Sequence, residues 1–210
     1  MQDSPIPNRF STWYDGFLYE KFIAPQSDRL QTLLTIFAKK SSTALDIGCG
    51  VGALSFKLAA KCSKVVGVDL SQRMISHAER KKLKLGATNV DFVCADAVDL
   101  ATMFPDGFDF ATLVLFLHEI DEAIRQKVVA SVLSLSDTLI IADFSSPFPK
   151  SAAARRLKVQ EFIAGTRHYR NFKTWMQNGA IDGFVDSMNL QVRKSIPWEN
   201  DAGKVVIVKS

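Results

Sequence analysis

The chain has 210 residues, of which 47% are hydrophobic and 23% charged, so it suits one α/β domain and not a disordered protein. Its net charge of +4 is a mild basic excess, which permits contact with nucleic acid without requiring it. No apolar run approaches membrane-spanning length, and the first residues lack the features of a secretory signal. The cysteines, Cys49, Cys62 and Cys94, form no CxxC pair, so we expect a cytoplasmic, reduced protein.

Aromatic residues are concentrated before the first predicted strand. Trp13, Tyr14 and Phe17 follow a helical spacing, and they form either a lid over a cleft or a helix packed on a sheet. A second helix is predicted over residues 28–39, with leucines on one face. We interpret residues 1–40 as an N-terminal helical lid and residues 41–210 as the main domain.

Apolar strands alternate with helical patterns from residue 43 onward. The predicted strands are residues 43–47, 64–68, 89–94, 108–114 and 138–142. The predicted helices between them are residues 51–61, 71–85, where Ser71 is a candidate cap, and 121–135. Continuous apolar strands joined by helices predict an α/β fold, with a parallel sheet covered by helices on both faces.

The last third of the chain departs from this alternation. Pro147 and Pro149 mark a break, after which residues 151–165 and 171–178 follow helical patterns. The final two strand-like segments, residues 189–197 and 204–209, are separated by the turn residues Asn200-Asp201-Ala202-Gly203. The chain is therefore predicted to end in a hairpin.

A glycine-rich loop, Gly48-Cys49-Gly50-Val51-Gly52, follows the first predicted strand and opens a helix. Glycine lets the backbone approach a ligand closely, and the helix N–H groups favour negative groups. The loop satisfies the loose dinucleotide pattern, and Asp69 stands where an acid would bind ribose hydroxyls. Asp46, two residues before the first glycine, would repel a pyrophosphate but suits a ligand that carries an ammonium and a sulfonium.

Four segments resemble, in order and spacing, the motifs of class I S-adenosylmethionine (SAM)-dependent methyltransferases: residues 45–52, 68–74, 94–97 and 109–120. Residues 142–147 further resemble the small-molecule branch near the ubiquinone/menaquinone C-methyltransferases. The resemblance implies a Rossmann-like fold with a seven-stranded, mostly parallel sheet and an antiparallel last strand. It also implies SAM as cofactor, S-adenosylhomocysteine (SAH) as product and a small-molecule acceptor, with residues 146–188 supplying helices around the acceptor pocket.

The resemblance assigns cofactor-binding roles along the chain. At the methionine end of SAM it places Asp46, Gly48, Cys49 and Gly50. At the ribose and adenosine it places Asp69, Leu70 and Met74, although Met74 equally suits the core. At the adenine it places Asp96 and Ala97, and Leu115 follows the fourth strand.

His118 is the candidate base or acceptor-orienting residue, because it lies where this family meets the methyl group; a structural histidine is the alternative. Tyr14 is expected to close over the methionine end. His168 either lines the acceptor pocket or lies in a surface turn. No metal is expected, because His77, His118 and His168 are scattered along the sequence.

Two other classes of function stay open. An RNA or protein methyltransferase would show a continuous basic face joining Lys81, Arg155 and Arg170. A non-catalytic SAM-binding module would have a filled acceptor pocket. The sequence leaves the oligomeric state open.

Overall fold

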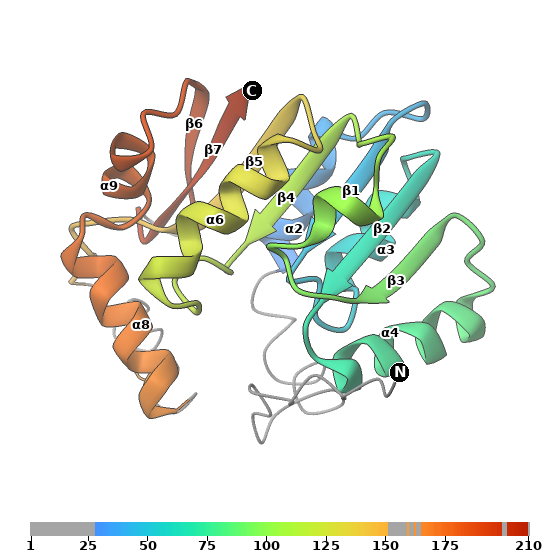
Figure 1. The fold of residues 1–210 in the computed structure, drawn as a ribbon, viewed down its shortest axis with the longest axis horizontal. Coiled ribbons are helices and arrows are strands. Elements are labelled where there is room, and N and C mark those ends of the chain that lie inside the picture. The colour runs from blue at the N-terminus through green and yellow to red at the C-terminus, as the bar shows by residue number, and fades with distance from the viewer. Residues whose placement is uncertain (1–27, 151–158, 160–161, 163–164, 199–200, 210) are drawn as a thin grey trace.

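A seven-stranded sheet with the order β3-β2-β1-β4-β5-β7-β6 forms the centre of the computed structural model, which describes residues 28–150, 159, 162, 165–198 and 201–209 (Figure 1). The strands are β1 (Thr43–Ile47), β2 (Lys64–Asp69), β3 (Val90–Cys94), β4 (Phe110–Val114), β5 (Thr138–Phe144), β6 (Val192–Trp198) and β7 (Gly203–Lys209). Strands β1 to β5 pair in parallel, whereas β7 is antiparallel to both β5 and β6. The predicted mostly parallel sheet with an antiparallel last strand is confirmed.

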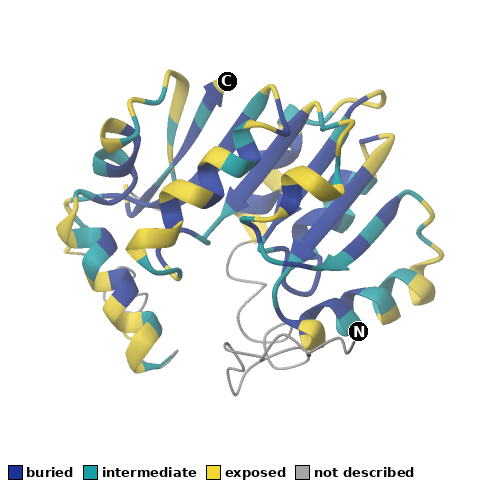
Figure 2. Ribbon diagram, viewed as in Figure 1, coloured by how far each residue is buried: buried dark blue, intermediate teal, exposed yellow. Residues whose placement is uncertain are grey.

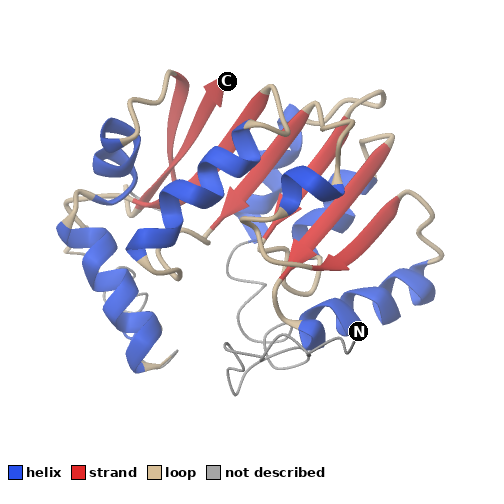
Figure 3. Cartoon of the chain, in the orientation of Figure 1, coloured by secondary structure: helices blue, strands red, loops and turns tan. Residues whose placement is uncertain are grey.

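Helices cover both faces of this sheet, as predicted (Figure 3). One face packs against α2 (Asp28–Leu34), α3 (Ala53–Ala59) and α4 (Gln72–Leu85), and a short 3-10 turn, η2 (Thr35–Phe37), follows α2. The other face packs against α5 (Leu100–Met103), α6 (Glu122–Leu133), α8 (Thr166–Gln177) and α9 (Ala180–Ser187). Among the described residues, no helix is both long and apolar enough to cross a membrane.

The two cores follow from the alternation of side chains along each strand. In β1, Leu45 and Ile47 belong to the core under α6 and α8, while Ala44 belongs to the core under α2 and α3. Figure 2 shows the central strands as the most continuously buried part of the chain. Both cores hold the sheet rigid, so the loops at its edge are attached to a fixed frame.

The strand order reverses at β1, which lies between β2 and β4. In an open parallel sheet, such a reversal opens a crevice outside the carboxyl ends of the strands, where ligands bind. The glycine-rich loop after β1 and the segment after β4 both lie at this carboxyl edge. The fold therefore brings together the motifs that the sequence singled out.

Several helices differ from the sequence predictions: α5 was not predicted, and the helix predicted over residues 28–39 ends at Leu34 and is followed by η2. α8 begins at Thr166, earlier than predicted, so His168 lies in a helix and not in a surface turn. α9 was not predicted, and its interior Gly183 is required because a Cβ there would lie 2.0 Å from the Asn178 carbonyl oxygen. Tyr14, Arg155, the N-terminal lid up to residue 27 and most of the helix predicted over residues 151–165 lie outside the described residues.

Candidate active site

The glycine-rich loop is fixed to the end of β2 by its own backbone. The amides of Gly48 and Cys49 both donate to the Val68 carbonyl oxygen, at 2.8 and 3.0 Å. Gly48, Gly50 and Gly52 have φ values of +69°, +54° and +78°, which L side chains rarely adopt. The loop therefore passes tightly over the ends of the central strands.

Phe116, in the segment after β4, lies directly against this loop. A Cβ at position 48 would lie 2.3 Å from the Phe116 Cδ2 atom, so only glycine fits beside the ring. Sequence reasoning missed Phe116, because its contact joins two segments that are far apart along the chain. The contact connects the cofactor loop to the segment that carries His118.

Asp69, at the end of β2, orders both the glycine loop and the start of α4. Its Oδ2 atom accepts a hydrogen bond from the Gly50 amide at 2.9 Å, and its Oδ1 atom accepts one from the Ser71 amide at 2.8 Å. The Ser71 hydroxyl caps α4 by accepting from the Met74 amide, as the sequence predicted. A carboxylate has about four acceptor positions, so Asp69 can accept hydrogen bonds from several donors at once.

Asp46 lies beneath the loop and is only 2% exposed. Its oxygens accept hydrogen bonds from the hydroxyls of Ser55, at 2.6 Å, and Thr112, at 2.9 Å. Burial raises the pKa of the Asp46 carboxyl to about 6. The hydrogen bonds from the two hydroxyls lower this pKa, but the effect of burial is larger. Burial also raises the pKa of the Cys49 thiol, which makes Cys49 a poor nucleophile.

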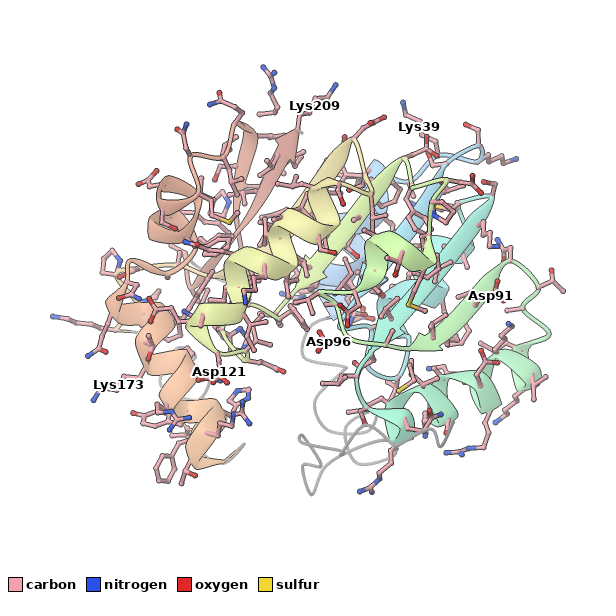
Figure 4. All side chains as sticks on the ribbon, viewed as in Figure 1. Lys39, Asp91, Asp96, Asp121, Lys173 and Lys209 are labelled. Atoms are coloured by element: carbon pink, nitrogen blue, oxygen red, sulfur yellow. The ribbon has the colours of Figure 1, made fainter. Side chains whose placement is uncertain are left out.

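The other predicted cofactor residues line the same edge of the sheet. Met74 and Ala97 are buried, whereas Leu70 and Asp96 are half-buried. Figure 4 shows Asp96 and Asp121 along the carboxyl edge, with Lys39 and Lys209 at the opposite edge. Leu115 has a positive φ of 51°, and its amide donates to the Ala142 carbonyl oxygen at 2.7 Å, so the chain turns sharply after β4.

His118 and Asp143 form a buried pair between the ends of β4 and β5. His118 Nδ1 lies 2.7 Å from Asp143 Oδ1, with exposed fractions of 2% and 0% for the two side chains. Asp143 Oδ2 also accepts from the amides of Leu117 and His118, at 3.0 and 3.3 Å. The carboxylate therefore fixes both the backbone and the ring of His118, a role that sequence reasoning did not assign to Asp143.

Aromatic rings surround His118 on the side of α8. The ring centroids of Phe144, His168 and Phe172 lie 4.8, 5.6 and 6.1 Å from that of His118. Phe148 packs edge-on against Phe144 at 5.7 Å. Because β5 and α8 supply these rings from distant parts of the chain, their grouping was not visible in the sequence.

The three histidines are scattered along the sequence, but the fold brings two of them together. His118, Glu119 and His168 place one ligand atom each within 4.8 Å of one another. His77 lies in α4, which packs on β2 and β3. The described part of the chain thus contains a His₂Glu cluster, which shares His118 with the buried pair of His118 and Asp143.

Comparison with known proteins shows similarity to methyltransferases. Residues 44–139 match the methyltransferase domain family. The chain is 28% identical over 188 residues to a ubiquinone biosynthesis O-methyltransferase of Xanthomonas euvesicatoria, covering 83% of this chain and 75% of the relative. The name of that relative specifies oxygen as the methylated atom, whereas the sequence resemblance pointed toward C-methyltransferases.

Solved structures share the fold. The magnesium protoporphyrin IX methyltransferase of Synechocystis, determined with SAH, superimposes with a TM-score of 0.62 at 21% identity, covering 89% of this chain and 83% of that one. The SAH complex of the N-methyltransferase NodS of Bradyrhizobium japonicum gives 0.61 at 15% identity, covering 92% and 91%. The glycine cradle and the Asp69 carboxylate at this edge suit a ligand with ribose hydroxyls, so SAM fits the site. Residues 44–139 thus match a methyltransferase domain, and in sequence and fold the chain is similar to SAM-dependent methyltransferases.

Proposed function

We propose that this enzyme transfers the methyl group of SAM to a hydroxyl oxygen of a small-molecule acceptor, and that His118 is the catalytic residue at that oxygen. The observation that carries the proposal is the buried pair of His118 and Asp143 at the carboxyl edge, 2.7 Å apart. A carboxylate on Nδ1 fixes the ring of a histidine and stabilises its protonated form. Such a pair suits a residue that receives a proton.

Bound SAM supplies a methyl group activated by its sulfonium. In the proposal, Asp69 accepts from the ribose hydroxyls, Asp96 accepts from the adenine amino group, and Asp46 orients the amino group of the methionine end. The remaining cofactor contacts are assigned to Gly48, Cys49, Gly50, Leu70, Met74, Ala97 and Leu115. Tyr14 is proposed to close over the methionine end.

The acceptor is proposed to lie against the aromatic side chains on the α8 side of His118. Phe144 and Phe172 are buried beside His118, and the half-buried Phe148 packs against both, so the surroundings of His118 are apolar and suit a planar aromatic acceptor. The name of the Xanthomonas relative supports oxygen as the accepting atom. In the transfer, the acceptor O–H proton goes to His118, the oxygen bonds to the methyl carbon, and the C–S electron pair stays on sulfur to give SAH.

A nucleic-acid or protein acceptor is not needed by this proposal. Lys81 and Arg170 belong to α4 and α8, which lie at opposite ends of the sheet, beside β3 and beside α6 and α9 (Figure 1). The site between them is lined by aromatic rings and carboxylates. All three cysteines are free, and we propose a cytoplasmic location for the enzyme.

The proposal predicts a specific kinetic effect of His118→Asn. Asparagine can still hydrogen-bond to Asp143 but cannot take up the acceptor proton, so kcat should fall roughly 10²- to 10⁴-fold. The measurement is formation of labelled product from methyl-labelled SAM with a panel of simple phenols and catechols. SAM affinity, followed by calorimetry, should stay within about twofold, because the cofactor contacts are unchanged.

His77→Asn is the matched control, because it makes the same change on α4, away from the pair. Its kcat should equal that of the unaltered enzyme. If His118→Asn retained a kcat near the unaltered value while folding normally, His118 would not be the proton acceptor.

A further inference from the structure

We propose that His118, Glu119 and His168 form a binding site for one divalent transition-metal ion. Their ligand atoms lie within 4.8 Å of one another, and His118 Nε2 is 4.0 Å from Glu119 Oε1. Two ligands on one zinc ion, each about 2.0–2.2 Å from the metal, are about 3.5 Å apart in a tetrahedral site. The cluster therefore needs only small side-chain rotations to close around an ion.

Asp143 provides the support that metal-binding histidines require. A ligating histidine almost always donates its second ring N–H to a carboxylate or carbonyl, which fixes its orientation. Here Nδ1 of His118 is held at 2.7 Å by Asp143, so Nε2 is the atom presented to the cluster. Asp143 is itself fixed by the amides of Leu117 and Phe144, at 3.0 and 2.7 Å.

A second network fixes α8, which carries His168, to the segment that carries His118 and Glu119. The Asn171 side chain donates to the Glu119 carbonyl oxygen at 2.7 Å. Arg125, which is only 2% exposed, donates from Nε to the Leu117 carbonyl oxygen and from Nη2 to that of Asn171, both at 2.9 Å. The three ligands thus stand on one rigid frame, as a site of fixed geometry requires.

The ligand set selects the class of ion. Two imidazoles and one carboxylate suit Zn²⁺ and the later first-row ions, whereas Mg²⁺ and Ca²⁺ prefer oxygen ligands alone. Three protein ligands leave coordination positions open for a substrate oxygen. Glu119 is exposed and His168 is half-buried, so an ion can reach the cluster.

The chemical role of the bound ion rests on the proposed function, methyl transfer to a hydroxyl. An acceptor hydroxyl bound to the ion would lose its proton to solvent, because the metal lowers the pKa of a bound O–H group. The oxygen would then take the methyl group, while the C–S electron pair remains on sulfur. In this state His118 is a metal ligand, and the ion replaces it in activating the hydroxyl.

The test is titration of the chelator-treated full-length enzyme with Zn²⁺ by calorimetry, and with Co²⁺ by visible absorption. We expect one ion per chain, and at least about tenfold weaker binding for both His168→Ala and Glu119→Gln. His77→Ala, which removes the remaining histidine, should bind the ion normally. These variants change side chains that are not fully buried, so the fold should persist; thermal unfolding checks this.

Absence of stoichiometric binding, or binding that neither His168→Ala nor Glu119→Gln weakens, would overturn the metal site. Methyl transfer that persists at full rate in the chelated, ion-free enzyme would overturn the role of the ion in activating the hydroxyl, and would leave His118 as the base of the proposed function. Conversely, an ion bound through these residues with no transfer to any hydroxyl acceptor would contradict the proposed function while keeping the site.

Discussion

At the scale of single residues, two aspartates at the carboxyl edge have contrasting surroundings. Asp69 is half-buried and bonds to two loop amides, whereas Asp46 is buried beneath the loop and bonds to two hydroxyls. Asp69 can contact a ligand directly, whereas burial disfavours the charged form of Asp46. The two residues therefore give different experimental signatures.

Asp69→Ala should weaken SAM binding roughly 10- to 100-fold, because hydrogen bonds to a charged acceptor contribute about 1.5–3 kcal/mol. Isothermal calorimetry measures this directly. Asp91→Ala is the matched control, since Asp91 lies on the neighbouring strand β3 and pairs with Lys82 instead of the loop. An Asp69→Ala variant that binds SAM as tightly as the Asp91→Ala variant would remove Asp69 from the cofactor site.

Asp46 should make the stability of the cofactor-free protein depend on pH. Its pKa is raised from 3.8 to about 6 in the folded state, so the folded protein holds this proton more tightly than the unfolded chain. The stabilisation is complete below about pH 3.8 and is lost as the pH rises through about 6, amounting to about 3 kcal/mol. Urea unfolding at pH 5 and pH 8 should show about half of this loss, because the other half occurs below pH 5.

Asp46→Asn is expected to remove that part of the pH dependence, because the amide does not titrate yet can still bond to Ser55 and Thr112. The comparison is the difference in unfolding free energy between the two pH values, variant against unaltered protein. Equal differences in both proteins would show that Asp46 titrates normally.

At the scale of elements, the glycine loop and the segment after β4 depend on each other. Position 48 combines a φ of +69° with a Phe116 ring carbon 2.3 Å from where a Cβ would stand. Gly86 shares the positive φ, at +62°, but nothing lies within 4 Å of its Cβ position. Substitutions at Gly86 and Gly48 therefore distinguish the cost of backbone strain alone from the cost of strain together with a steric clash.

Gly86→Ala should destabilise the protein by about 1–2 kcal/mol, from backbone strain alone. Gly48→Ala should destabilise it by roughly 1–3 kcal/mol more, since the ring must also move. Denaturant unfolding of both variants measures the difference in their destabilisation. Adding Phe116→Ala to the Gly48→Ala variant should reduce that difference, because the ring that clashes is removed. Equal destabilisation by the two single substitutions would mean that Phe116 yields freely and does not hold the loop.

At the scale of the whole molecule, local pattern predicted the sheet and the cofactor edge well. β1 was predicted with its observed bounds, Thr43–Ile47, because a buried parallel strand is a continuous apolar run bounded by turn residues. The closing hairpin was visible from its turn chemistry. The Ser71 cap also followed from local sequence.

The acceptor side was harder to predict, because tertiary packing alone assembles it. His118 and His168 are fifty positions apart in the numbering, yet their ring centroids lie 5.6 Å apart across β4 and α8. Asp143 closes a strand, and no local signal links it to His118. α9 was missed because Gly183 lowers helix propensity, whereas its real role is to admit the Asn178 carbonyl.

The activity proposed for this enzyme is methyl transfer from SAM to a hydroxyl of a small molecule. The most direct measurement incubates the enzyme with ¹³C-methyl SAM and a cell extract separated into small-molecule and macromolecular fractions, followed by ¹³C NMR of each. We predict an O-methyl resonance in the small-molecule fraction that grows as SAH accumulates. Label in RNA or protein, or a methyl resonance on carbon, nitrogen or sulfur, would contradict O-methylation of a small molecule.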